Sequence, residues 1–255
     1  MRTREILKKI AYNTFKPLGF DIPRRRVRTS LAGVLDHVKS LNFRPKTVID
    51  VGVAYGTFEL YEKFPQANHL LVEPVAECEG FLQDICQKYK AQYVIAAAGK
   101  SSGNIIINVH PGIQGSSILK EMEGSDADGV PREVPMVTLD DLCSEKNLKG
   151  SYLIKLDVQG AELDVLEGAK NVLQETEMII LEVSLFEFMV NSPQFYEIVT
   201  YMKNQGFVVY DIFGNCIRPL DGALAQVDLA FVKENGQFRQ SHFYATKEQR
   251  QKMNI

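Results

Sequence analysis

Residues 47–60 have the sequence TVIDVGVAYGTFEL, which predicts a strand, a glycine-containing turn and the start of a helix. The β-branched run ends at Asp50, and Gly52 and Gly56 follow four residues apart. In an open parallel sheet a ligand binds beyond the carboxyl ends of the strands, where such turns lie. The stretch therefore predicts a ligand-binding strand–turn–helix unit.

Strands and helices alternate along the rest of the chain. The hydrophobic pattern predicts strands at 68–74, 91–99, 151–158 and 177–184, and helices at 57–64, 76–89, 161–173 and 193–205. It also predicts an added β segment at 104–110, a strand entering a helix at 134–143, and an antiparallel hairpin from 207–213 and 227–234. Continuous apolar strands separated by helices are typical of a parallel sheet that is covered on both faces. We therefore expect an α/β fold with one doubly wound, mostly parallel sheet, whose C-terminal hairpin forms its edge.

The N-terminal part of the chain is basic and predicted to be helical. Residues 1–28 contain nine Arg or Lys and two acidic residues, a charge of +7, which leaves −10 on the remainder of a chain whose total is −3. Helices are predicted at 4–15 and 31–41, and Ser30 can cap the second. The alternatives for the basic arm are peripheral contact with an anionic surface, or a solvated, partly helical arm that helps solubility or packs on a partner subunit, as in a homodimer. The acidic remainder argues against a nucleic-acid-binding protein.

Composition also limits where the protein works and which ions it holds. No apolar run approaches the roughly 20 residues of a membrane-spanning helix, and no signal-peptide pattern follows the first charges. A cytoplasmic protein without a transmembrane segment is therefore expected. The four histidines are scattered, and no CxxC pair joins the four cysteines, Cys78, Cys86, Cys143 and Cys216. This distribution predicts reduced cysteines and no structural metal site.

Carboxylates occupy the predicted ends of four strands. Asp50, Glu73, Asp157 and Glu182 each fall at the carboxyl end of a different strand. A buried carboxylate without a partner is costly, so four of them at one edge of a sheet are poorly explained as stabilising features. The pattern favours a functional site at that edge.

The glycine pattern distinguishes between two cofactors. A dinucleotide site requires GxGxxG, whose middle glycine lets the backbone approach a pyrophosphate. The chain has DxGxxxG instead, with Val53 and Ala54 where a diphosphate would lie. Gly52 and Gly56 leave room for an amino-acid moiety, Asp50 can face its ammonium group, and Glu73 can accept hydrogen bonds from ribose hydroxyls. The sequence thus predicts S-adenosylmethionine as cofactor, bound by Asp50, Gly52, Ala54, Gly56, Glu73, Pro74, Ala98 and Asp157.

From about Thr47 to Val232 the chain resembles the FkbM-like S-adenosylmethionine-dependent methyltransferases. The resemblance rests on VIDVGVAYG, LLVEP, GSSIL at 115–119, VPMVTLDDL and, most specifically, IKLDVQGAE followed by IILEVS. It implies a Rossmann-like, seven-stranded class I methyltransferase sheet and O-methylation of a sugar, glycan or small metabolite. The chain departs from the family pattern at Val53-Ala54, where Ala-Asn is common, and at Gln159, where Glu is common. The implied organisation is a basic helical extension at 1–45, the methyltransferase domain at 46–235 and a tail at 236–255.

Four residues are candidates for the chemistry. Methylation of an oxygen requires an aligned acceptor and removal of the hydroxyl proton. Asp157 is the first candidate for the general base, and Lys155 lies on the same face of its strand, where it can pair with Asp157. Glu162, at the start of the next helix, is either catalytic or a first-turn capping residue. Glu182 can contact acceptor hydroxyls.

Some alternatives stay open in the sequence. The same carboxylates could bind a divalent cation, although they form no compact cluster in the chain, so a metal is not the favoured expectation. The long loop from Pro111 to about Gly129 predicts a lid, with His110, Ser116 and Ser117 near the acceptor or cofactor. The other function classes are a nicotinamide-dependent oxidoreductase, which the missing middle glycine opposes, and a non-catalytic Rossmann-like binding protein.

Overall fold

The computed structural model describes residues 28–253. The helix predicted at 4–15 and nearly all of the basic arm lie outside these residues. The contact of this arm with an anionic surface or with a partner subunit therefore stays a prediction. Helix α2 (Leu31–Ser40) matches the second predicted helix, and the Ser30 hydroxyl accepts a hydrogen bond from the Gly33 N–H at 3.3 Å, as expected for its cap.

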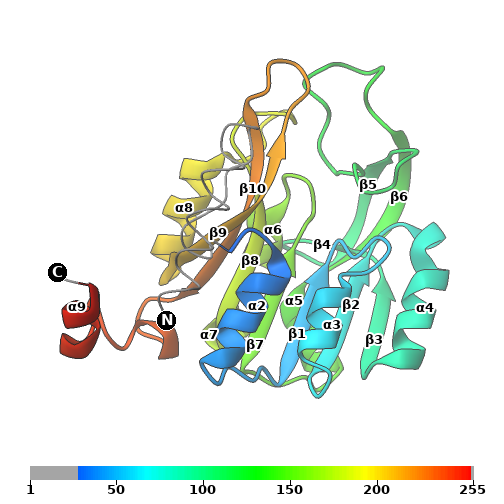
Figure 1. The fold of residues 1–255 in the computed structure, drawn as a ribbon. Coiled ribbons are helices and arrows are strands. Elements are labelled where there is room, and N and C mark those ends of the chain that lie inside the picture. Colours follow the sequence, from blue (N-terminus) through cyan, green and yellow to red (C-terminus); the bar gives the residue numbers. More distant parts are fainter. Residues whose placement is uncertain (1–27, 254–255) are drawn as a thin grey trace.

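A seven-stranded sheet forms the centre of the molecule (Figure 1). Its order is β3-β2-β1-β7-β8-β10-β9. The strands are β1 (Thr47–Val51), β2 (Asn68–Glu73), β3 (Ala91–Ile95), β7 (Tyr152–Leu156), β8 (Thr176–Ser184), β9 (Phe207–Ile217) and β10 (Leu224–Lys233). Pairing is parallel from β3 to β8, whereas β10 runs antiparallel to both of its neighbours. The doubly wound, mostly parallel seven-stranded sheet is therefore confirmed, and β10 of the C-terminal hairpin is inserted between β8 and the edge strand β9.

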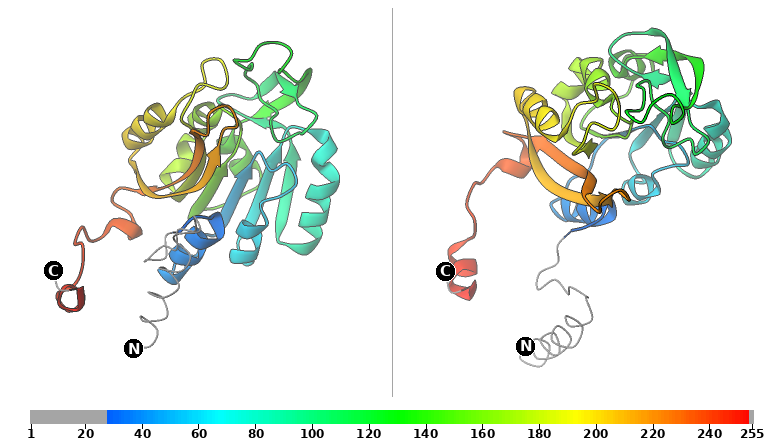
Figure 2. Two further views of the ribbon diagram at one scale, coloured as in Figure 1. Left: turned by 45° about the horizontal axis from the view of Figure 1, so that its top comes forward. Right: turned by 90° about the horizontal axis from the view of Figure 1, so that it is seen from above.

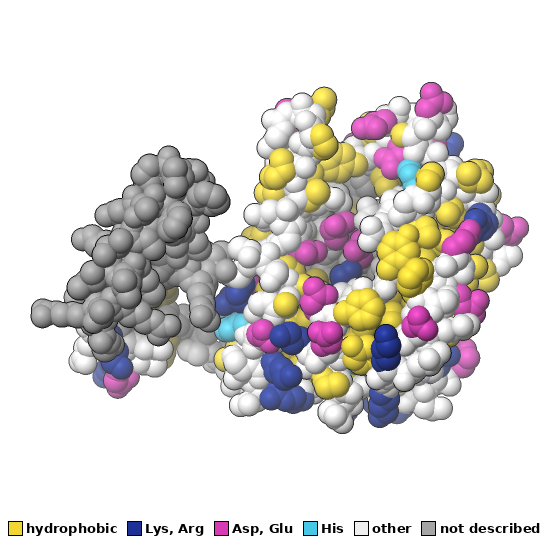
Figure 3. All heavy atoms as spheres, turned by 45° about the vertical axis from the view of Figure 1, so that its right-hand side comes forward, with side chains coloured by type: hydrophobic (Ala, Val, Ile, Leu, Met, Phe, Trp, Pro, Cys, Tyr) yellow, Lys and Arg dark blue, Asp and Glu magenta, His cyan; other side chains and the backbone are white. Residues whose placement is uncertain are grey.

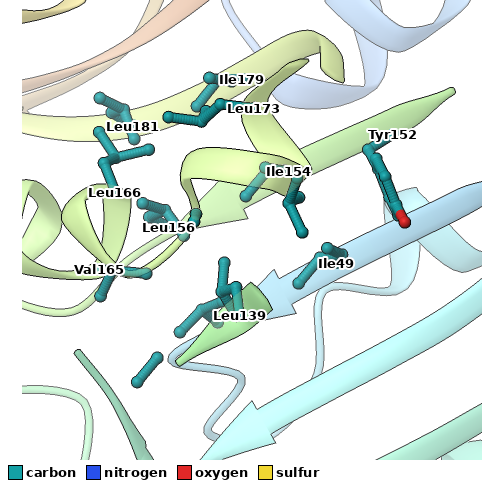
Figure 4. Packing of buried hydrophobic residues seen from close by; sticks show 14 of the residues in the cluster. Ile49, Leu139, Tyr152, Ile154, Leu156, Val165, Leu166, Leu173, Ile179 and Leu181 are labelled. Carbon is teal, nitrogen blue, oxygen red and sulfur yellow. The ribbon is translucent and has the colours of Figure 1, made fainter. Parts of the chain in front are cut away.

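Helices cover both faces of this sheet (Figures 1 and 2). On one face α2, α3 (Phe58–Lys63) and α4 (Glu79–Lys88) bury apolar side chains against the strands. On the other face α5 (Leu139–Glu145), α6 (Glu162–Glu167), α7 (Lys170–Gln174) and α8 (Phe195–Asn204) do the same. Figure 4 shows this second layer, where Leu139 and Val165 lie against strand residues such as Ile49 and Leu156. The parallel strands are buried on both faces, which explains their continuous apolar sequences.

A second, three-stranded sheet stands beside the first. It pairs β4 (Ala97–Ala98), β6 (Val130–Val137) and β5 (Gly103–Val109) in the order β4-β6-β5. The single strand predicted at 91–99 was wrong, because the chain leaves the main sheet after Ile95 and Ala97–Ala98 pair with β6 instead. The predicted loop connects β5 to β6 and lies over the carboxyl end of the main sheet (Figure 1).

One predicted helix is divided in two. The segment 161–173 forms α6 and α7, which are separated at Gly168 and Ala169. Gly168 packs so closely on the main chain that a Cβ there would lie 2.0 Å from the carbonyl oxygen of Gly99. This contact between distant segments fixes the break, which local periodicity could not indicate.

The C-terminal residues extend away from the sheet (Figure 2). They form a short 3-10 turn (Gln237–Arg239) and helix α9 (Lys247–Met253), which buries no residue. No helix between residues 28 and 253 combines the length and apolar character that crossing a bilayer requires.

Candidate active site

The turn after β1 depends on glycine. Gly52 has φ +74°, and a Cβ there would lie 1.9 Å from the main-chain oxygen of Asp157 at the end of β7. Gly56 has φ +110°, and its Cβ would lie 2.8 Å from the Cδ1 of Ile85. Positive φ angles favour glycine, yet Ala54 between them also has a positive φ of +45°. Gly52 thus allows the turn to lie directly against the end of β7, and Gly56 allows it to pack closely on Ile85 of α4.

Glu73 secures this turn from the end of β2. Its Oε2 accepts the main-chain N–H of Ala54 at 2.8 Å, and its Oε1 accepts that of Val75 at 2.9 Å. The side chain is buried, and burial raises the pKa of its carboxyl above the ordinary range. Each carboxylate oxygen has a further lone pair for a ligand hydroxyl.

A narrow cleft opens above these residues. The lining includes eight of the residues that the sequence predicted, Gly52, Ala54, Glu73, Pro74, Ala98, Asp157, Ser116 and Ser117. Ala97, Ile107, Ile113 and Ile118 give it an apolar side. We refer to it as the donor cleft, after the methyl donor that the sequence predicts for these residues. Gly56 and His110 are not part of its lining.

Asp50 lies beneath the donor cleft, not in its lining. It is fully buried, and its two oxygens accept hydrogen bonds from the Tyr61 hydroxyl at 2.5 Å and the Thr57 hydroxyl at 3.2 Å. Burial raises the pKa of its carboxyl, an effect that Lys155 opposes. In this arrangement Asp50 ties the start of α3 to the sheet.

A hydrogen-bonded group of polar side chains joins β7, β8 and β10. Lys155 Nζ donates to Asp157 Oδ2 at 3.0 Å, and Gln159 Nε2 donates to Asp157 Oδ1 at 3.0 Å. The same Gln159 nitrogen donates to Glu182 Oε2 at 2.9 Å, and Gln226 Nε2 donates to that oxygen at 2.9 Å. We call these five residues, together with Asp228, the polar cluster. It brings three of the four predicted catalytic residues together.

The polar cluster is acidic and partly shielded from water. Burial, with repulsion from Asp157, raises the pKa of Glu182 to about 7. Burial also raises the pKa of Asp228 to about 6. For Lys155, burial lowers the pKa, but the carboxylates of Asp157 and Asp50 outweigh it, so the pKa is raised. Figure 3 shows acidic side chains gathered in a hollow on this side of the molecule, with hydrophobic side chains around it.

Glu162, the fourth predicted catalytic residue, lies apart from this group. Its Oε1 accepts the main-chain N–H of Gly160 at 3.1 Å, and its side chain is almost fully buried. Burial raises the pKa of its carboxyl to about 7. It belongs neither to the lining of the donor cleft nor to the hydrogen bonds of the polar cluster, a position that agrees with the capping alternative.

Three members of the polar cluster were not predicted as site residues: Gln159, which was noted only as a departure from the family pattern, Gln226 and Asp228. Asp228 and Gln226 lie near the start of β10, and Asp228 pairs directly with Glu182 on β8. Because β10 is antiparallel, its beginning lies at the same edge as the ends of the parallel strands. The sequence predicted the hairpin that contains these β10 residues. It did not predict that β10 pairs with β8, which is the contact that brings them to the site.

The predicted lid contacts the site through Ser117. The Ser117 hydroxyl donates to the main-chain oxygen of Gln159 at 2.7 Å and accepts the Leu119 N–H at 3.0 Å. Ser116 accepts the His110 N–H at 3.1 Å, and the His110 ring lies 3.7 Å from Glu121. Further along, Glu121 forms a β-bridge with Met189. These contacts hold the 111–129 loop over the sheet edge.

Between residues 28 and 253, no group of three or more His, Cys, Asp or Glu side chains is arranged to hold a metal ion. Cys78, Cys86, Cys143 and Cys216 are free thiols.

Comparison with known proteins places the chain among methyltransferases. The profile of the methyltransferase FkbM domain matches residues 50–209. "Methyltransferase 1" of Beauveria bassiana (strain ARSEF 2860) is 26% identical over 183 residues, which cover 64% of this chain and 72% of that protein. The "2-O-methyltransferase NoeI" of Sinorhizobium fredii (strain NBRC 101917 / NGR234) is 46% identical over 66 residues, which cover 26% of this chain and 27% of that protein.

Solved structures resemble the chain more distantly. An S-adenosylmethionine-dependent methyltransferase from Clostridium acetobutylicum ATCC 824 has 12% sequence identity and a TM-score of 0.46, over 89% of this chain and 99% of that chain.

Proposed function

The chain belongs to the methyltransferase FkbM domain family, and we propose that it transfers a methyl group from S-adenosylmethionine to a hydroxyl group of a saccharide or small metabolite. The observation that carries the proposal is the contact between the donor cleft and the polar cluster, which share Asp157. One site can thereby hold a methyl donor beside groups that handle a proton. The name of the Sinorhizobium relative, a 2-O-methyltransferase, supports oxygen as the acceptor atom.

The residues of the donor cleft fit S-adenosylmethionine. Glu73 has free lone pairs for two ribose hydroxyls, and the apolar side around Ala97 and Ile107 suits an adenine ring. When bound, this donor supplies an electrophilic methyl group on a positively charged sulfur. The acidic polar cluster next to the cleft favours such a cation electrostatically.

The same residues do not favour a nicotinamide dinucleotide. Pyrophosphate binding uses free main-chain N–H groups at the turn between the first strand and its helix. Here the N–H of Ala54 is already bonded to the Glu73 carboxylate. A pyrophosphate at this turn would meet a carboxylate with no basic side chain in the lining of the cleft.

Calorimetric titration with S-adenosylmethionine and, separately, with NAD tests the donor. We expect micromolar binding of S-adenosylmethionine only, and a Kd at least roughly tenfold higher in Glu73→Ala, about 1.4 kcal/mol. Glu62→Ala, which removes an exposed carboxylate on α3, is the matched control and should bind as the wild type does. Absence of S-adenosylmethionine binding by folded protein would refute the proposal.

A further inference from the structure

The carboxylates of the polar cluster differ in which of their oxygens are free. Asp157 has both oxygens engaged, one by Lys155 and the other by Gln159. Glu182 receives both of its hydrogen bonds on Oε2, from Gln159 and Gln226. Within residues 28–253, neither Glu182 Oε1 nor the carboxyl of Asp228 has a hydrogen-bond partner. These oxygens are not among the buried side-chain atoms without a partner, so solvent reaches them and they are free to accept hydrogen bonds from ligand hydroxyls.

We propose that Glu182 is the general base, that Asp228 binds the adjacent hydroxyl, and that the acceptor is therefore a vicinal diol, as on a saccharide ring. This inference rests on the proposed function and assigns the acceptor side of that same site. It reverses the expectation from the sequence that Asp157 is the base. Asp157 becomes a positioning residue that holds Lys155 and Gln159.

The pairing of β8 with β10 brings the two free carboxyls side by side. Glu182 and Asp228 are directly opposite in an antiparallel pair, so their side chains are on the same face with Cβ atoms roughly 5 Å apart. Gly214 on β9 lies against Asp228, because a Cβ there would be 2.0 Å from Asp228 Oδ2. The absence of a side chain at Gly214 therefore leaves room for the Asp228 carboxyl.

The side-chain amides of Gln159 and Gln226 fix the orientation of the Glu182 carboxyl. Each has its nitrogen within 2.9 Å of Oε2, so the carboxyl plane is held and Oε1 is the atom left to accept a proton. In the transfer, the acceptor oxygen forms a bond to the methyl carbon, while the carbon–sulfur bond of the donor breaks and its electron pair stays on sulfur. The hydroxyl proton passes to Glu182 Oε1, so the products are a methyl ether and S-adenosylhomocysteine.

The electrostatic surroundings suit both roles. Glu182 faces Asp157 and Lys155 on β7 and Asp228 on β10. Burial and the neighbouring carboxylates raise the pKa of Glu182 to about 7, where a general base is most effective. Excess negative charge also disfavours phosphorylated or carboxylated groups at the reacting end of the acceptor.

Binding experiments test the diol without requiring turnover. Saturation-transfer NMR on the protein with S-adenosylhomocysteine should detect methyl α-D-mannopyranoside, which has a cis-2,3-diol, but not its 2,3-O-isopropylidene derivative. Asp228→Asn should weaken the diol signal, whereas Glu177→Gln, at the far end of β8, should not. Equal signals from both sugars, or no signal from the diol, would overturn the acceptor assignment.

The base assignment is tested on the carboxyl itself and on the rate. In wild-type protein labelled with ¹³C-carboxyl Glu, two resonances should titrate near pH 7, those of Glu182 and Glu162, and only the Glu182 resonance should be absent in Glu182→Gln. With a diol acceptor, Glu182→Gln should lower kcat by roughly 100-fold or more and remove the rise in rate through that pH. Asp228→Asn should mainly raise KM, by about tenfold.

Other outcomes contradict the assignment clearly. A Glu182 carboxyl that titrates below pH 5, or a Glu182→Gln variant that keeps the pH profile while Asp157→Asn loses it, would return the role of base to Asp157. In Glu182→Gln and Asp228→Asn the Kd for S-adenosylhomocysteine, which lacks the positive charge on sulfur, should stay within about twofold of the wild type. Loss of donor binding in the wild type would instead refute the proposed function.

Discussion

The hydroxyl of Ser117 donates a hydrogen bond of 2.7 Å to the main-chain oxygen of Gln159. This bond connects the 111–129 loop to the turn after β7, where Gln159 has an unusual φ of +51°. The Gln159 side chain holds Asp157 and Glu182 at the same time. One residue therefore contacts the lid with its main chain and the polar cluster with its side chain.

Ser117→Ala should loosen the lid. The substitution leaves the Gln159 carbonyl and the Leu119 N–H without their partner, in a place where Ser117 is buried. We expect the free energy of unfolding to fall by about 1–2 kcal/mol, and amide hydrogen exchange to rise through residues 113–119. The control Ser101→Ala alters an exposed hydroxyl and should change neither quantity. Unchanged exchange in Ser117→Ala would mean that other contacts hold the loop.

Gly52→Ala should disrupt the turn that forms the donor cleft. The new Cβ would meet the Asp157 carbonyl oxygen at 1.9 Å, and the φ of +74° is unfavourable for alanine. We expect the free energy of unfolding to fall by roughly 2–4 kcal/mol, together with loss of S-adenosylmethionine binding. Denaturant unfolding and calorimetry measure the two effects.

Gly80→Ala is the matched control for that substitution. Gly80 lies in α4, and apart from the neighbouring residues and backbone of that helix no atom lies within 4 Å of the position of its Cβ. Alanine should stabilise the helix by about 0.5–1 kcal/mol. A loss of stability as large as that of Gly52→Ala would show that the effect at Gly52 is not specific to the close contact and positive φ of its turn.

Glu162→Gln should change how stability depends on pH. Burial raises the pKa of Glu162 from near 4.5 to about 7, so the folded protein holds this proton more tightly than the unfolded chain. The free energy of unfolding therefore falls as pH rises between these values, by up to about 3 kcal/mol for this group. Glutamine can still accept the Gly160 N–H but does not ionise, so this part of the fall should disappear.

Urea unfolding at pH 5 and pH 8 measures this difference. Relative to the wild type, Glu162→Gln should gain stability at pH 8 and little at pH 5. Glu145→Gln, an exposed substitution at the end of α5, should follow the wild-type curve. A Glu162→Gln variant that loses stability equally at both pH values would indicate that the carboxyl acts through its shape and hydrogen bond alone.

Features that depend on local sequence were predicted well. The strand ending at Asp50, the turn at Gly52 and the strand ending at Glu73 follow from residues next to each other in the chain, because β-branched runs and glycine act locally. Parallel pairing then brings the strand ends together, so Asp157 and Glu182 could also be placed at one edge.

Features that depend on distant contacts could not be predicted in the same way. The position of Asp228 requires that β10 lies between β8 and β9, and the break at Gly168 requires the approach of Gly99. The engagement of Asp50 by Tyr61 and Thr57 depends on the direction of the first turn of α3. Hydrophobic periodicity contains none of these tertiary relations, and they determine which carboxyl oxygens remain free.

Lys155→Met should show how far the positive charge of Lys155 stabilises the neighbouring carboxylates. Lys155 donates to Asp157 at 3.0 Å, and the carboxylates of Asp50 and Asp228 also act on it. Its removal leaves these acids without a nearby cation, so we expect a loss of about 3 kcal/mol in the free energy of unfolding at pH 8. The loss should shrink at pH 5, where part of the negative charge is neutralised. Lys149→Met, which changes an exposed lysine just before β7, should have little effect at either pH.

The double variant Lys155→Met/Asp157→Asn separates charge balance from packing. Neutralising Asp157 removes one of the acids that the lysine balances, so the double variant should be more stable than the sum of the single effects predicts, by about 1–3 kcal/mol. Urea unfolding of all four proteins at pH 8 gives this coupling energy. Additive effects would mean that Lys155 contributes through the packing of its aliphatic chain, because an ion pair that stabilises the fold must produce a coupling between its two members.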